Sequence, residues 1–245
     1  MEDIIFGRNS VIEVLESDRP INKLFILKGE RHGSISKILD LARDKKVVIS
    51  EVQKAKLDEM TNNQNHQGVV IAVSPYEYCE VDDILNVAKE RNEPPFILIA
   101  DGIEDPHNLG AMIRTAECMG VHGVIIPKRR AVGVTNTVAK VAAGALEHMK
   151  IARVNNINDS IEELKEKGVW VVGTDAEGED LLTDVDMKGS IAIVIGSEGE
   201  GMSSLTKKKC DFLAKIPMKG KITSLNASVT CGMVVYEAAR QRGNK

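Results

Sequence analysis

The chain has 245 residues, 43% of them hydrophobic, and a formal net charge of −4, which is typical of a globular protein with one large or two small domains. Its four cysteines are scattered, with no Cys-x-x-Cys pair and no histidine at ligand spacing. This pattern argues against a zinc site and a disulfide framework and is typical of a reducing cytosol. Because Met1–Phe6 is unlike a signal peptide and no apolar run reaches the roughly 20 residues of a membrane span, we expect a cytoplasmic protein without a membrane partner.

The charge is unevenly distributed along the chain. Residues 76–200 hold 12 basic and 23 acidic residues, whereas residues 201–245 hold nine basic and two acidic ones. A basic C-terminal segment, with Lys128–Arg130 as a second cluster, could bind phosphates. The alternative is that Lys207–Lys209 only solvate a helix end, where cations suit the helix dipole. Four phenylalanines, three tyrosines and one tryptophan argue against a stacking platform for bases.

The first 75 residues predict a small α/β domain, because short apolar strands alternate with amphipathic helices. The expected strands are 24–27, 47–49 and 68–73. The expected helices follow Asn9–Ser10, follow Ser34 or Ser36, and span 54–60. His66 lies in a polar loop, where we expect a solvated side chain, with an RNA contact as the alternative. The charged, proline-bounded segment 76–95, with a helix at 81–89, is expected to be a linker.

Residues 96–245 predict a second α/β domain with a mostly parallel sheet. The expected strands are 96–100, 124–126, 149–154, 169–172, 191–195 and 212–216. The helices between them are expected at 111–119, 135–143 and 161–167, and a last helix begins near Leu225. Each strand ends in a polar or glycine-rich loop. Such strands, buried on both faces, place a site at their carboxyl ends.

Three of these loops carry candidate functional residues. Asn108 stands at a helix start, and Arg114 follows in an apolar setting where a guanidinium needs an anion, either a protein carboxylate or a ligand phosphate. The loop Gly196–Gly201 lacks the spacing of a dinucleotide fingerprint, a Walker loop or a nucleophile elbow. A nucleotide-binding enzyme and a hydrolase are therefore disfavoured. Ser224 and Asn226 could cap the last helix or present polar groups to a ligand.

Together, the segments Asn108–Thr115, Ile195–Gly201 and Ile216–Ser228 resemble, in order and spacing, the three motifs of the SpoU/TrmH family of RNA 2′-O-ribose methyltransferases in the SPOUT superfamily. The resemblance implies a parallel-sheet domain whose C-terminal segment forms a deep trefoil knot, an exception to unknotted topology. It also implies S-adenosylmethionine as cofactor, an RNA substrate, and a homodimer with active sites near its interface. The front domain is similar to the substrate-binding domain of the RlmB branch, which methylates a guanosine of 23S rRNA, and resembles certain ribosomal proteins.

The resemblance assigns roles to individual residues. Arg114 and Asn108 are expected to be catalytic or to position RNA, Glu198 and Ser224 to support them, and Asn226 to contact cofactor or substrate. The residues expected to hold the cofactor are Thr174, Gly196, Ile216 and Leu225. No carboxylate–histidine cluster suggests a metal site, so no metal is expected. The alternatives left open are a tRNA ribose methyltransferase and a non-catalytic RNA-binding factor of ribosome assembly.

Overall fold

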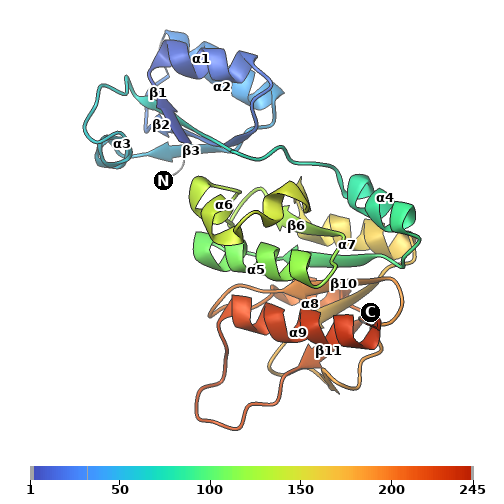
Figure 1. Cartoon of the computed structure of the whole chain (residues 1–245). Coiled ribbons are helices and arrows are strands. Elements are labelled where there is room, and N and C mark those ends of the chain that lie inside the picture. The colour runs from blue at the N-terminus through green and yellow to red at the C-terminus, as the bar shows by residue number, and fades with distance from the viewer. Residues whose placement is uncertain (1–2, 32, 244–245) are drawn as a thin grey trace. The chain divides into compact units, whose positions relative to one another are not determined.

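The computed structural model describes residues 3–31 and 33–243. Contacts divide the chain into two compact units. The first runs to Glu77 and includes Gly133–Thr137, and the second comprises Tyr78–Val132 and the chain from Val138 onwards. Each unit has its own sheet and its own hydrophobic core (Figure 1).

The first unit is a four-stranded sheet in the order β1-β4-β2-β3. β4 pairs antiparallel with β1 and β2, and β3 runs parallel to β2. Buried residues alternate along β2, because one face of the sheet packs against α1 and α2. The bounds are β1 Asp3–Phe6, α1 Arg8–Glu16, β2 Ile21–Leu27, α2 Ser34–Asp44, β3 Ile49–Val52, α3 Lys54–Met60 and β4 Val69–Val73.

Most expected elements of this unit form, but several differ from the expectation. β2 begins at Ile21, three residues earlier than expected, and β4 begins at Val69, one residue later. β1 was not predicted, because four residues carry little pattern and the strand exists through its pairing with β4. β3 begins at Ile49, two residues later than expected. The expectation of a solvated His66 is wrong. Its side chain is 8% exposed, lies 3.1 Å from Asp58 and accepts a hydrogen bond from the backbone N–H of Gly68. His66 therefore has a structural role in the described unit.

The second unit is built on a seven-stranded sheet in the order β7-β6-β5-β10-β8-β11-β9, in which every neighbouring pair is parallel. This confirms the predicted parallel sheet. Its elements are α4 Val81–Arg91, β5 Phe96–Ala100, α5 Pro106–Cys118, β6 Gly123–Pro127, α6 Asn136–Ala142, the 3₁₀ turn Ala145–Glu147, β7 Lys150–Val154, α7 Ile157–Glu166, β8 Trp170–Thr174, β9 Asp180–Leu181, β10 Ile191–Ile195, α8 Ser204–Lys209, β11 Phe212–Lys215 and α9 Ala227–Gln241.

Helices cover both faces of this sheet. The inward side chains of α4 and α7 share one core with residues of β5, β8 and β10. α5 and α9 pack side by side on the sheet (Figure 1). The central strands β5, β6 and β10 are fully buried, which explains their continuous apolar sequences. The loops of interest therefore begin at the ends of fully buried strands.

The segment 76–95 differs from the expected linker. Its helix α4 buries Val81, Ile84 and Ala88. Ile84 packs so closely that a Cβ placed on Gly123 would lie 2.5 Å from its side chain. The contact boundary falls between Glu77 and Tyr78, close to the expected start of this segment, and α4 belongs to the second unit.

Other differences concern short elements and helix starts. α5 begins at Pro106, five residues before the expected start, because Asp105 caps it and a proline suits the first helical position. β9 and α8 were not predicted. The trefoil knot stays a prediction. Among the described residues, no helix is long and apolar enough to cross a membrane, and no group of three or more potential metal ligands is found.

Candidate active site

The loops that follow four neighbouring strands meet at one edge of the second sheet. β5, β10, β8 and β11 lie next to one another and run parallel. Their carboxyl ends lead into residues 101–105, 196–203, 175–179 and 216–226. Parallel strands end at the same edge, so this order brings together motifs that are far apart in the sequence. The prediction that these polar loops share one edge is confirmed.

Three predicted site residues form a hydrogen-bonded network at this edge. The amide of Asn108 donates to Oε1 of Glu198 at 3.0 Å, and the amide of Asn226 donates to Oδ1 of Asn108 at 2.9 Å. Asn226 also donates to the same oxygen of Glu198, which accepts a third bond from the backbone N–H of Ala227 at 3.2 Å. Asn108 is 7% exposed, so its amide depends on these partners. The network ties the starts of α5 and α9 to the loop after β10.

The hydrogen-bonding groups of Asn226 are fully used within the protein. Both hydrogens of its amide nitrogen have acceptors, Asn108 and Glu198. Its oxygen caps α9 by accepting from the backbone N–H groups of Ser228 and Val229, and it also accepts from the Ser228 hydroxyl. In this structure the side chain of Asn226 holds the helix start and orients its neighbours, and both hydrogens of its amide are used within the protein.

A cavity of about 510 Å³ lies beside this network, and we call it the loop cavity. All four residues expected to hold the cofactor line it, together with two of the expected catalytic residues: Thr174, Gly196, Ile216, Leu225, Glu198 and Ser224. The hydroxyl of Thr174 donates to the backbone oxygen of Val194 at 3.2 Å. Ser224 is exposed and makes no hydrogen bond with the described residues, so it does not join the network around Glu198.

Gly196 shapes the loop cavity through close backbone packing. A Cβ on Gly196 would overlap the backbone of both Gly201 and Met202. The loop turns back on itself, with Ser197 and Gly201 exchanging backbone hydrogen bonds of 3.3 and 3.0 Å. Gly199 and Gly201 adopt positive φ angles that suit glycine. The glycines of this motif are therefore required to place Glu198.

Arg114 departs from the expectation of an apolar setting. It is exposed on α5, pairs with no carboxylate among the described residues, and lines neither of the cavities at this edge. The reason is the helical period, since the buried side chains Met112, Ile113 and Ala116 point to the sheet while Arg114 points away from it. The first alternative, a protein carboxylate as partner, is therefore not found among the described residues, and a ligand phosphate stays a prediction.

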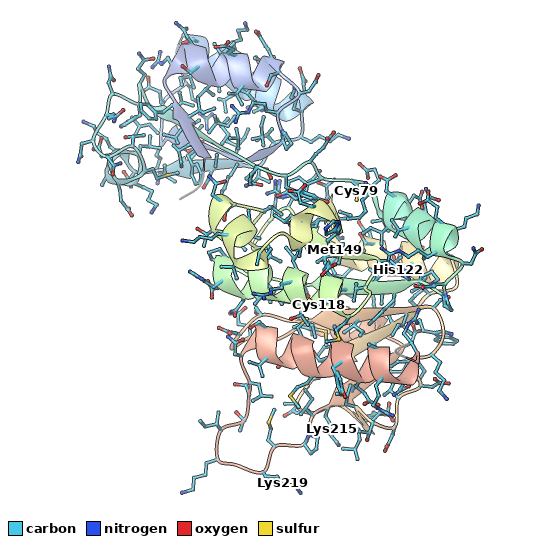
Figure 2. The ribbon with its side chains drawn as sticks, viewed as in Figure 1. Cys79, Cys118, His122, Met149, Lys215 and Lys219 are labelled. Carbon is cyan, nitrogen blue, oxygen red and sulfur yellow. The ribbon has the colours of Figure 1, made fainter. Side chains whose placement is uncertain are left out.

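The lysines near the site divide into paired and free groups. Lys207 lies 2.5 Å from Asp175, and Lys209 lies 2.5 Å from Glu162. Burial opposes ionisation of Asp175, but hydrogen bonds from Lys207 and a backbone N–H outweigh it and hold the pKa of this carboxyl below its usual value. These pairs weaken the idea of a phosphate site at Lys207–Lys209. Lys219, by contrast, lies on the long loop between β11 and α9 (Figure 2), and is exposed.

A larger cavity of about 940 Å³ borders the same edge, and we call it the sheet-edge cavity. It shares the loop 197–201 with the loop cavity. Asp101, at the end of β5, lines it, and its Oδ2 accepts a hydrogen bond from the Thr206 hydroxyl at 3.1 Å. Burial raises the pKa of Asp101, and the bond from Thr206 opposes this shift. Sequence reasoning did not single out Asp101, although its place directly after a buried strand is the signal that marks it.

Two family models match the chain, one on each part. The model of the SpoU rRNA Methylase family matches residues 95–236, and that of RNA 2′-O ribose methyltransferase substrate binding matches residues 4–79. The chain is 51% identical over 240 residues to YacO of Bacillus subtilis, whose name describes a TrmH family tRNA/rRNA methyltransferase, and the alignment covers 98% of this chain and 96% of that protein. A similarly named protein of Staphylococcus aureus is 48% identical over 243 residues, covering 99% and 98%.

Solved structures agree with these matches. The SpoU methyltransferase AviRb of Streptomyces viridochromogenes, in complex with S-adenosylmethionine, has a TM-score of 0.61 and 26% identity, covering 98% of this chain and 90% of its own. The TrmH/SpoU tRNA modifying enzyme of A. aeolicus has a TM-score of 0.56 and 28% identity, covering 66% of this chain and 83% of its own. With both parts of the sequence matched and near-complete relatives at about half identity, the chain belongs to the SpoU/TrmH family of S-adenosylmethionine-dependent RNA methyltransferases.

Proposed function

We propose that the protein transfers the methyl group of S-adenosylmethionine to a ribose 2′-hydroxyl of RNA, with a guanosine of 23S rRNA as its target. The observation that carries this proposal is the network of Asn108, Glu198 and Asn226 beside the loop cavity. It places fixed polar groups next to a cavity with the size of a cofactor site. The substrate-binding model on residues 4–79 supports the ribose as acceptor.

The loop cavity fits S-adenosylmethionine in size and chemistry. Its volume of about 510 Å³ lies within the roughly 300–1,000 Å³ of small-molecule sites. Ile216 and Leu225 offer apolar walls to an adenine ring, while Glu198 and neighbouring carbonyl groups offer acceptors to a cation. When bound there, the cofactor supplies an electrophilic methyl group on a sulfonium. With the cofactor bound there, the residues at this edge would position the acceptor hydroxyl and limit the access of competing water.

We assign Arg114 to the ribose hydroxyl. A guanidinium stays protonated at neutral pH, so it would donate hydrogen bonds to the 2′-oxygen and stabilise negative charge there, while the hydroxyl proton passes to a water molecule. Asn108 and Glu198 act as positioning residues, since their bonds fix the start of the helix that carries Arg114. Because Arg114 lies outside both cavities of the described chain, a second subunit is needed to enclose it with the substrate.

A homodimer through α9 meets this need. Val229, Met233 and Tyr236 are 50%, 42% and 53% exposed. Their spacing of four and three residues places them on one face of the helix, where they form an apolar stripe that is exposed to solvent in the monomer. α9 packs beside α5, so a partner on this stripe would lie close to Arg114. Met233→Asp should convert the dimer to a monomer in light scattering and abolish methyl transfer. A Met233→Asp protein that remains a dimer would contradict the assigned interface.

The test of the proposed reaction is Arg114→Ala. Methyl transfer from labelled S-adenosylmethionine to 23S rRNA fragments should fall by about 100-fold or more, the usual loss when one such donor is removed. Cofactor binding measured by calorimetry should stay within about threefold of the unmodified protein. Lys188→Ala, which removes an exposed charge from the same unit, is the matched control. Undiminished methyl transfer by Arg114→Ala would contradict the role assigned to Arg114.

Ribosomal RNA is favoured over tRNA by the extent of the structural matches. The A. aeolicus tRNA modifying enzyme and a structure named for methylation of C/U34 on tRNA cover 66% and 60% of this chain. An rRNA methyltransferase of Sinorhizobium meliloti, with a TM-score of 0.58 and 25% identity, covers 98% of this chain. The two structures named for tRNA thus match a smaller share of this chain. Mass spectrometry of ribose methylation in rRNA and tRNA from a deletion strain tests this, and a loss confined to tRNA would overturn it.

A further inference from the structure

An ion pair lines the loop cavity. Asp175 lies directly after β8 and Lys207 lies on α8, and their charged groups are 2.5 Å apart. The side chain of Asp175 is 11% exposed and that of Lys207 is 35% exposed. α8 packs against α7, whereas the network around Glu198 holds the starts of α5 and α9, which pack against each other. The ion pair and the network therefore belong to different walls of the cavity.

The carboxylate of Asp175 is held in place by the fold around it. Its backbone N–H donates to the carbonyl oxygen of Ala214 at 3.0 Å, and its Oδ1 accepts from the backbone N–H of Glu177 at 2.9 Å. A Cβ on Gly178 would lie 2.4 Å from the backbone of β11, so this loop lies directly against that strand. Oδ1 and Oδ2 are bound by Glu177 and Lys207 respectively. Each oxygen can accept one more hydrogen bond from a ligand.

The loop cavity is poor in positive charge. Among the described residues that line it, Lys207 is the single basic one. Four acidic residues line it as well: Asp175, Glu177, Glu198 and Glu200. A ligand that carries a carboxylate needs a cation beside it in such surroundings, because like charges repel. An ammonium has three N–H donors, and Asp175 takes one of them, so Lys207 keeps two for a carboxylate of the ligand.

S-adenosylmethionine carries the complementary pair of charges. The methionine end of this molecule bears an ammonium and a carboxylate on the same carbon atom, so the two groups lie side by side, as Lys207 and Asp175 do. The adenosine end is uncharged at neutral pH and suits the apolar side chains of Ile216 and Leu225, which line the same cavity. Hydrogen bonds with an ionised donor or acceptor are roughly twice as strong as neutral ones, so the charged end of the ligand is the one that such a pair recognises best.

We propose that Asp175 and Lys207 bind the amino-acid end of S-adenosylmethionine, with the cofactor ammonium on Asp175 and the cofactor carboxylate on Lys207. This inference rests on the proposed function, which takes the loop cavity as the cofactor site. Neither residue lies in the segments 108–115, 195–201 and 216–228 that carry the family motifs. The pair is therefore a recognition element of this chain that the motifs alone do not reveal.

Calorimetry with two ligands tests the assignment. S-adenosylhomocysteine has the amino-acid end, whereas 5′-methylthioadenosine lacks it and keeps the adenosine. The unmodified protein should bind S-adenosylhomocysteine about tenfold more tightly or better, as expected for hydrogen bonds between charged groups. Lys207→Met and Asp175→Asn should each remove most of this difference and leave the affinity for 5′-methylthioadenosine nearly unchanged. The double variant D175N/K207M leaves no unpaired charge behind, and it should bind the two ligands about equally.

Lys208→Met is the matched control. Lys208 lies on the same helix, is exposed and lines neither cavity, so this variant should keep the full difference between the ligands. Normal binding of 5′-methylthioadenosine shows that a variant is folded and that its adenosine site is intact. An equal loss of affinity for both ligands, as expected if Asp175 bound the ribose hydroxyls of the cofactor, would overturn the assignment. Variants at 175 and 207 that behave like Lys208→Met would overturn it too.

The outcomes for this pair and for the proposed reaction can be told apart. If the unmodified protein binds both ligands and methylates RNA, but the variants keep the full difference, the inference about Asp175 and Lys207 fails and the proposed function stands. If the variants lose the difference as expected but the unmodified protein methylates no ribose, the proposed function fails instead. If the unmodified protein binds neither ligand, both are overturned.

Discussion

Replacing Glu198 by alanine tests the network that joins the three motifs. One oxygen of this carboxylate accepts bonds from Asn108, Asn226 and the backbone N–H of Ala227. Alanine removes the acceptor and leaves the three donors in place. Asn108 and Ala227 are buried, 7% and 4% exposed, so their N–H groups lose a partner in a site that water reaches poorly. Asn226 is exposed and can turn to solvent.

The expected loss of stability is about 2 kcal/mol. A buried donor left without a partner costs about 1–3 kcal/mol. Two such donors are created, but Glu198 itself is exposed, so water can enter the space that its side chain leaves. The summed loss of stability should therefore lie near the lower end of what two unpaired buried donors would cost. Glu198→Gln keeps an acceptor oxygen and loses only the charge, so its loss should stay below about 1 kcal/mol.

Urea unfolding followed by tryptophan fluorescence is a suitable assay. Trp170 is the single tryptophan of the chain and lies in the second unit. The signal therefore reports on the unit that contains the network, even where the two units unfold separately. Both Glu198 variants should also be assayed for methyl transfer, which we expect to fall more in Glu198→Ala than in Glu198→Gln.

A double-mutant cycle tests whether loss of the network causes the destabilisation in Glu198→Ala. In Asn108→Ala the buried amide is absent, so the further loss from Glu198→Ala should shrink by about 1 kcal/mol or more. Strict additivity of the two changes, or equal destabilisation by Gln and Ala at position 198, would refute the idea that acceptor geometry holds the site together.

Two further predictions concern the loop and the far end of the sheet. Gly196→Ala should weaken S-adenosylmethionine binding in calorimetry by about tenfold or more, or roughly 1.4 kcal/mol, because its Cβ would meet the backbone of 201–202; Gly189→Ala, with no atom within 4 Å, should not. Burial lowers the pKa of His122 below its usual 6.5 and outweighs the opposing effect of the hydrogen bond that His122 donates to Glu93. Its contribution to stability is thus present above pH 6.5 and lost as the pH falls below it. His122→Asn should therefore make the free energy of unfolding less dependent on pH, by up to about 1.4 kcal/mol per pH unit. Urea titrations between pH 7.5 and 5.5 measure this, and an unchanged dependence of unfolding free energy on pH would contradict it.

The buried environment of His122 explains the sign of this prediction. Its Nδ1 accepts a hydrogen bond from the backbone N–H of Phe96 at 3.0 Å, and Nε2 lies 3.0 Å from a Glu93 oxygen. The ring is therefore held with its proton on Nε2. Protonation of Nδ1 would set two N–H groups against each other in a side chain with 0% exposure. The folded protein accordingly disfavours the charged form.

Much of the fold was readable from the sequence because its signals are local. The strands Phe96–Ala100 and Ile191–Ile195 were predicted with their observed bounds, since a continuous apolar run between polar loops has few other interpretations. Lys54–Met60 was likewise predicted as observed. The short elements β1 and β9 escaped prediction because strand pairing, a long-range contact, is what forms them.

Motif order and spacing were enough to identify the family, the cofactor and the residues that gather at one edge of the sheet, because both are properties of the linear chain. What these residues contact there depends on how the chain folds. In the folded protein the side chain of Asn226 is hydrogen-bonded to its neighbours, Ser224 lies outside the network, and Arg114 is exposed on the surface. Glu198 lines both cavities. The direction in which a side chain points and the partner it meets depend on strand order and helix rotation, which bring Asn108 next to Asn226, 118 positions further along the chain.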